Sequence, residues 1–101
     1  MIIKSVAVIY FSPTGTTKDI LYAIAKGMDI NSPRIIDITF PNIRNTNISS
    51  IDEDMLIIGV PVYEERIPKI LYPFLNTLKG NKKPVVLVAV YGNIGDGIVL
   101  N

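Results

Sequence analysis

The chain has 101 residues, a formal net charge of +1, 49% hydrophobic residues and 19% charged residues. This composition predicts one small domain, residues 1–101, with a packed core, and it excludes a disordered chain. The sequence contains no cysteine and no histidine. Disulfides, thiolate or imidazole metal ligands, and Ser-His-Asp or Cys-His catalysis are therefore excluded. The near-neutral charge provides no bulk attraction to nucleic acid or to anionic lipid.

The apolar runs of the sequence are short. None approaches the ~18 residues that cross a bilayer, and the N-terminus lacks the basic leader and cleavage site of a signal peptide. We therefore expect a cytoplasmic protein with no membrane contact.

Strand and helix patterns alternate along the chain. Runs rich in β-branched residues predict strands at residues 2–11, 34–40, 55–60 and 84–91. A helix is expected to begin at Lys18 and to end at residues 31–33. Residues 41–50 are expected to form mostly loop, in which a short helical turn is possible. The helical spacing of apolar residues predicts a second helix over residues 67–79, in which Pro73 is an interior blemish. Residues 92–97 read as a loop, and residues 98–101 as the start of a further helix.

This alternation predicts an α/β fold with a parallel sheet and right-handed crossovers. Ligands bind such sheets beyond the carboxyl ends of the strands. Three loops are expected at that edge: residues 12–17, 61–66 and 91–97. They are rich in hydroxyls, glycines and aromatics, so this edge is the predicted functional site.

The first of these loops has the most specific pattern. Gly15 is surrounded by four hydroxyl residues directly before a predicted helix: Ser12, Thr14, Thr16 and Thr17. Free N–H groups at a helix start bind anions, and a glycine lets the backbone approach a phosphate closely. The alternative is a helix cap with additional threonines. The G-x-x-x-x-G-K-[ST] spacing of a nucleotide triphosphatase is absent.

The three loops together resemble the flavodoxin family. Residues 6–17 (VAVIYFSPTGTT) resemble its phosphate loop, residues 58–63 (IGVPVY) its second flavin loop, and residues 90–93 (VYGN) its third. The chain is most similar to flavodoxin-like domains that precede a ferredoxin domain. The resemblance implies a three-layer αβα sandwich and non-covalently bound FMN.

Carried over by position, the resemblance assigns three sets of contacts to FMN. The phosphate would be held by Ser12, Thr14, Gly15, Thr16 and Thr17. The isoalloxazine ring would lie along Pro61, Val62 and Tyr63. Its other side or its pyrimidine edge would meet Tyr91, Gly92 and Asn93. For Tyr63 and Tyr91, the alternative is that they only cap strand ends.

The sequence departs from the flavodoxin pattern in two places. The second loop continues Glu64-Glu65-Arg66, and two acids beside a flavin would lower its potential; alternatively they are solvated charges, paired with Arg66. The family's fifth strand and flanking helices are also missing, which leaves a sheet of order 2-1-3-4, truncated before the fifth strand. The fourth strand would then be an exposed edge, which predicts association, strand exchange or a fragment of a longer protein.

The leading functional hypothesis is an FMN-binding electron-transfer module that needs no catalytic residue and no metal. Its partner would be a redox protein, such as a ferredoxin domain outside this chain, and the exposed edge allows a homo-oligomer. Nothing marks the hydride-donor site that a flavin reductase would need. The alternative is a truncated domain without flavin that serves as an interaction or structural fragment. A phospho-receiver is disfavoured because residues 10–12 and 60–61 lack its acidic cluster.

Overall fold

The computed structural model describes residues 3–30, 32–45, 51–78, 82–93 and 97–100, with side chains described as far as Tyr91. Its strands are β1 (Val6–Tyr10), β2 (Arg34–Asp37), β3 (Met55–Val62), β4 (Val85–Asn93) and β5 (Gly97–Leu100). Its helices are α1 (Thr16–Gly27), α2 (Pro41–Arg44) and α3 (Tyr72–Thr77), the last preceded by a 3₁₀ turn, η1 (Lys69–Leu71).

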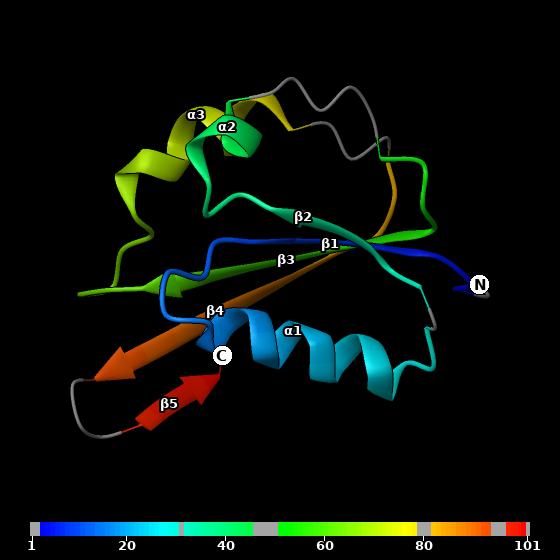
Figure 1. Cartoon of the computed structure of the whole chain (residues 1–101), viewed down its shortest axis with the longest axis horizontal. Coiled ribbons are helices and arrows are strands. Elements are labelled where there is room, and N and C mark those ends of the chain that lie inside the picture. Colours follow the sequence, from blue (N-terminus) through cyan, green and yellow to red (C-terminus); the bar gives the residue numbers. More distant parts are fainter. Residues whose placement is uncertain (1–2, 31, 46–50, 79–81, 94–96, 101) are drawn as a thin grey trace.

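All these strands form one sheet in the order β2-β1-β3-β4-β5. The first four are parallel, which confirms the predicted order 2-1-3-4 and the α/β class. Helix α1 lies on one face of the sheet, and α2 and α3 lie on the other (Figure 1). The three layers of the predicted sandwich are therefore present.

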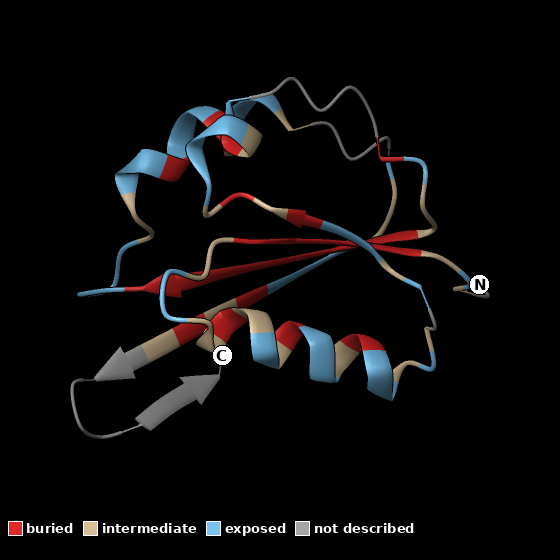
Figure 2. Ribbon diagram, viewed as in Figure 1, coloured by how far each residue is buried: buried red, intermediate tan, exposed pale blue. Residues whose placement is uncertain are grey.

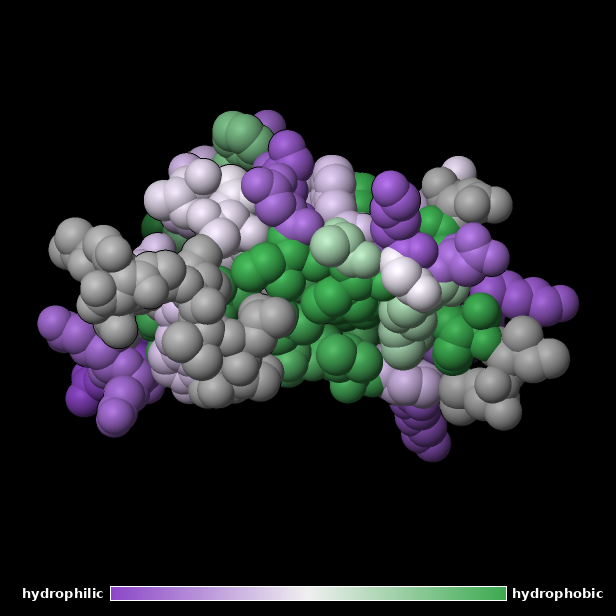
Figure 3. Space-filling model, turned by 90° about the horizontal axis from the view of Figure 1, so that it is seen from below, coloured by the Kyte–Doolittle hydropathy of each residue, from purple (hydrophilic) through white to green (hydrophobic). Residues whose placement is uncertain are grey.

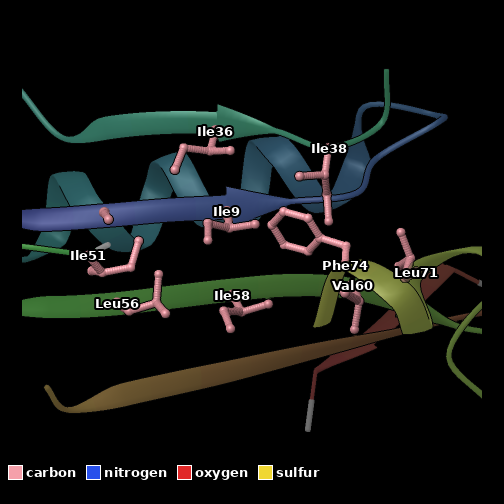
Figure 4. Close-up of a cluster of buried hydrophobic side chains, with 10 residues drawn as sticks. Ile9, Ile36, Ile38, Ile51, Leu56, Ile58, Val60, Leu71 and Phe74 are labelled. Carbon is pink, nitrogen blue, oxygen red and sulfur yellow. The ribbon is translucent and has the colours of Figure 1, made fainter. Parts of the chain in front are cut away.

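Two hydrophobic clusters, one on each face, hold the layers together. On the α1 face, Leu21 packs against residues of β1, β3 and β4. On the other face, Leu71 and Phe74 pack against β1, β2 and β3 (Figure 4). Strands β1 and β3 are buried along their whole length (Figure 2), so they contribute side chains to both clusters. This two-sided burial explains why their sequences are nearly uninterrupted apolar runs.

Helix α3 is shorter than the helix predicted over residues 67–79. The segment starts as the 3₁₀ turn η1, and the α-helix begins only at Tyr72 and ends at Thr77. Pro73 therefore lies in the first turn of α3. The N–H groups of a first turn have no acceptor within the helix, so the N–H that proline lacks is not needed there. The prediction that Pro73 lies in the interior of a helix was wrong, because the helix starts later than its apolar spacing suggests.

The C-terminal prediction is corrected most strongly. Strand β4 continues to Asn93, and β5 pairs with it antiparallel in a register that joins Tyr91 to Val99 and Asn93 to Gly97. The loop expected from residue 92 and the helix expected from residue 98 were wrong; residues 94–96 of that loop lie outside the described residues. The β-branched residues Ile98 and Val99 suit a strand, and the edge of β4 provides the partner.

Asp54 joins the starts of β1 and β3. Its carboxylate accepts hydrogen bonds from the backbone N–H groups of Lys4 (2.9 Å) and Ser5 (3.2 Å), and its own N–H donates to Ser5 Oγ (2.9 Å). The hydrogen bond from Lys4 lowers the pKa of the Asp54 carboxyl below its usual value, and Ser5 adds to this effect.

We expect Asp54→Asn to make stability less sensitive to acid. Because the folded-state pKa of Asp54 is lowered, its contribution is complete above the unfolded-state pKa of about 4 and is lost as pH falls through the folded-state value. The melting temperature of the variant should lie below that of the wild type at pH 7, and the gap should narrow below pH 4. Thermal unfolding followed by circular dichroism over this range measures the gap; a gap that is constant with pH would contradict the assignment.

Candidate functional site

The predicted loops follow β1, β3 and β4, which are neighbours in the sheet. The first loop is attached to β3 where it leaves β1, because the Phe11 N–H donates to the Gly59 carbonyl at 3.1 Å. Farther along β3, Val62 is the register partner of Tyr91 on β4. The structure therefore gathers all three predicted segments at one carboxyl edge.

The first loop turns into α1 through Gly15. Gly15 is the N-cap residue and has φ +86°, a conformation that favours glycine. Its N–H donates to the Ser12 carbonyl at 3.2 Å, and the Lys18 N–H donates to Ser12 Oγ at 3.0 Å. The N–H groups of Thr16 and Thr17 belong to the first helical turn, where the helix provides no acceptor. The helix start can therefore receive an anion.

The hydroxyl groups of the loop have different surroundings. Thr14 is exposed, and its Oγ1 donates to Thr16 Oγ1 at 3.3 Å. The backbone of Ser12 is fixed by an N–H bond to Thr39 Oγ1 at 2.8 Å. Thr17 is only 3% exposed, and its methyl group packs toward Gly59. The side chains of Ser12, Thr14 and Thr16 are thus more accessible to a ligand than that of Thr17.

Gly59 sets the distance between α1 and the sheet. A Cβ atom at this position would lie 2.5 Å from Leu21 Cδ1 and 2.9 Å from Thr17 Cγ2. Only glycine permits this close approach of α1 to β3. Gly59 is absent from the predicted site residues, although a lone glycine inside a buried strand is a signal of close backbone approach.

The second predicted segment divides into a buried and an exposed part. Pro61 and Val62 lie within β3 and are buried, so Val62 offers a ligand mainly its backbone. Tyr63 follows at the end of the strand and is 49% exposed. The side chain that can stack on a planar ligand is therefore that of Tyr63.

The chain turns back directly after Tyr63. The backbone N–H and C=O groups of Tyr63 and Arg66 bond reciprocally, both at 2.9 Å. Between them, Glu64 and Glu65 have φ of 51° and 65°, which is the pattern of a type I′ turn. Both acids are exposed, and in this described stretch no ion pair joins either of them to Arg66. The predicted pairing with Arg66 is therefore absent.

The third predicted segment lies in a strand instead of a loop. Tyr91, Gly92 and Asn93 belong to β4, and the last two pair with Ile98 and Gly97 of β5. Tyr91 is half-buried. This segment borders the carboxyl edge, with its backbone engaged in the sheet.

Sequence reasoning missed an aromatic pair beneath α1. Tyr10, at the end of β1, meets Tyr22 of α1 edge-to-face with ring centroids 6.2 Å apart, and Lys18 Nζ lies 5.6 Å from the centre of the Tyr22 ring. Burial, followed by hydrogen bonding with Tyr22 and the charge of Asp37, raises the pKa of Tyr10 above its usual value. Tyr10 is therefore a neutral support for α1.

The family of the chain follows from a comparison with known proteins. A scan against protein-family models matches the flavodoxin domain over residues 7–94. The chain belongs to the flavodoxin domain family. A search of curated proteins gives no match. Within the described ranges of this flavodoxin domain, no helix is long and apolar enough to cross a membrane, and no group of acidic side chains is arranged to hold a metal ion.

Proposed function

We propose that this flavodoxin domain binds FMN non-covalently at the carboxyl edge of its sheet and transfers electrons. The observation that carries the proposal is the start of α1. There, Gly15 in the left-handed region directs the chain into a helix whose first N–H groups lack helical acceptors. This arrangement suits a terminal phosphate, and the family match supports a flavodoxin-type function.

The residues present fit FMN in chemical terms. Hydroxyls of Ser12, Thr14 and Thr16 and the N–H groups of the first helical turn would hold the phosphate. The exposed ring of Tyr63 would cover the isoalloxazine, and Tyr91 with the β4 backbone would border it. When bound, FMN supplies the electron-accepting chemistry. The chain's own residues bind it, orient it and limit its contact with water.

Electron transfer of this kind requires no protein acid or base. We propose that a redox protein, such as a ferredoxin domain, meets the flavin edge in the cytoplasm. Glu64 and Glu65 lie at the tip of the adjacent turn, so their charges would lower the flavin potential, within the limits that solvent screening sets.

Titration of FMN fluorescence with the purified protein tests the proposal. We expect quenching at micromolar protein. Thr14→Ala should weaken FMN binding about tenfold, because a hydrogen bond to a charged group is worth about 1.5 kcal/mol. Ser32→Ala, an exposed hydroxyl removed outside the three loops, should leave the affinity unchanged. Absence of quenching by a folded wild-type protein would contradict FMN binding and leave an interaction or structural role.

A further inference from the structure

We propose that Thr39, in the turn after β2, is a positioning residue for the phosphate site: its hydroxyl group fixes the backbone of Ser12 and, through Ser12, the start of α1. This inference rests on the proposed binding of FMN there. Thr39 is half-buried, and its Oγ1 accepts a hydrogen bond from the Ser12 N–H at 2.8 Å. Thr39 lies outside the three predicted loops, so it adds a fourth segment to the site.

The first loop is attached to both strands that neighbour β1. The Phe11 N–H donates to the Gly59 carbonyl of β3 at 3.1 Å. The next N–H along the chain, that of Ser12, points to the other side and donates to Thr39. Successive N–H groups of a strand alternate in this way between its two neighbours. Thr39 therefore provides the attachment of the loop on the β2 side.

The bond to Thr39 replaces a bond of the regular ladder. Strands β1 and β2 are parallel, with Tyr10 opposite Asp37, and the Ile38 N–H donates to the Tyr10 carbonyl at 2.9 Å. In a parallel ladder that continued, the next bond would run from the Ser12 N–H to the Ile38 carbonyl. A side-chain hydroxyl takes the place of that carbonyl. The loop can thus turn away from the sheet while its N–H keeps a partner.

Arg44 engages the carbonyl that the continued ladder would use. Arg44 is only 9% exposed. Its Nη1 donates to the Ile38 carbonyl at 3.0 Å and lies 3.5 Å from the Thr39 carbonyl. Helix α2, which begins at Pro41, brings this side chain back over the turn. A hydrogen bond from a guanidinium is stronger than one between neutral groups. Without the Thr39 hydroxyl, the Ser12 N–H would therefore have to compete with Arg44 for Ile38.

The backbone of Thr39 is itself held in place. Its N–H donates to Asp37 Oδ1 at 3.0 Å, a local bond from backbone to side chain that is typical of turns. The guanidinium of Arg44 holds the carbonyl that precedes it. Both bonds exist without a ligand, so Thr39 offers Ser12 an acceptor in a fixed position. Support of this kind keeps a binding loop in its productive geometry.

Ser12 passes this constraint on to the start of α1. Its carbonyl accepts from the Gly15 N–H at 3.2 Å, and its Oγ accepts from the Lys18 N–H at 3.0 Å. The packing of α1 against the sheet is hydrophobic, and the molecule shows a broad hydrophobic area on this side (Figure 3). Hydrophobic contacts are non-directional, so they hold α1 near the sheet without orienting the loop. The orientation of the helix start therefore depends on Ser12, and Ser12 depends on Thr39.

Amide hydrogen exchange of the protein without FMN tests this role independently of flavin binding. Thr39→Val removes the hydroxyl and keeps the branched shape. In this variant the Ser12 and Gly15 amides should exchange about tenfold faster than in the wild type, whereas the Leu21 amide in the middle of α1 should keep its rate. Thr39→Ser retains the hydroxyl and should restore the protection.

Unchanged exchange of the Ser12 amide in a folded Thr39→Val variant would overturn the proposal. If the valine variant does not fold, Thr39→Ala removes the same hydroxyl without placing a methyl group where it stood, and the same outcomes apply to it.

Fluorescence titrations with FMN and riboflavin test the consequence for the site. Because riboflavin lacks the phosphate, Thr39→Val should weaken FMN binding about tenfold and leave riboflavin binding within about twofold of the wild type. Thr77→Val, which removes a hydroxyl bond of 2.9 Å at the end of α3, should change neither affinity. An equal loss for both flavins would overturn the proposal. A wild type that binds neither flavin would contradict the proposed function instead, and hydrogen exchange would still decide the role of Thr39.

Discussion

Gly59→Ala should destabilise the protein by about 1–3 kcal/mol, the usual cost of overpacking a core. The new methyl group would lie 2.5 Å from Leu21 Cδ1 and 2.9 Å from Thr17 Cγ2. Neither side chain has room to withdraw, because Leu21 is fully buried and Thr17 nearly so. For a domain of this size, the melting temperature should fall by about 10 °C.

The same substitution should weaken FMN binding, because α1 can accommodate the methyl group only by moving its first turn away from β3. Gly27→Ala is the matched control. Nothing lies within 4 Å of a Cβ atom at that position, and it should stabilise α1 by about 0.5 kcal/mol. Thermal unfolding of both variants measures the contrast. Equal melting temperatures would contradict the close approach of α1 to the sheet.

The loss of stability caused by substituting Gly15 should depend on how readily the new residue adopts a positive φ, and not on the size of its side chain. Gly15 has φ +86°, and nothing lies within 4 Å of a Cβ atom there, so the cost is conformational. Asparagine adopts this region more readily than other residues, and β-branched residues adopt it least. We expect Gly15→Asn to be mildest, Gly15→Ala to cost about 1 kcal/mol, and Gly15→Val to cost more.

FMN affinity should follow the same order, with about a tenfold loss for Gly15→Ala, since a relaxed φ would turn the N–H groups of the first helical turn away from the phosphate. Chemical unfolding and fluorescence titration measure the two effects separately. If the larger asparagine proves more harmful than alanine, steric crowding would replace backbone strain as the explanation.

The sequence predicted β1 and β3 well because burial on both faces leaves an unbroken apolar run. It placed the start of α1 within two residues, since Gly15 and the threonines mark a helix start. It failed at the C-terminal hairpin, where Ile98–Leu100 is too short for periodicity to separate strand from helix. That choice depends on the free edge of β4, which only the assembled sheet reveals.

The predictions about the candidate site likewise succeeded where topology or a local pattern decides the outcome, and failed where tertiary packing decides it. The three loops could be placed at one sheet edge because topology fixes where parallel strands end. The turn at Glu64-Glu65 could not be predicted, because type I′ turns usually contain asparagine and glycine. The contacts of Tyr10 with Tyr22, and of Thr17 with Gly59, join α1 to residues of two different strands. Such contacts depend on the packing of α1 against the sheet and leave no local pattern.

The turn after Tyr63 has a consequence for binding kinetics. Because the backbones of Tyr63 and Arg66 bond reciprocally, the loop that carries Tyr63 beside the candidate site is ordered before any ligand arrives. A planar ligand that stacks on Tyr63 would lose little conformational entropy in ordering the loop. Association should then be limited by diffusion and orientation instead of loop rearrangement. Two glutamates in the left-handed region maintain this preorganisation at a cost in folding stability.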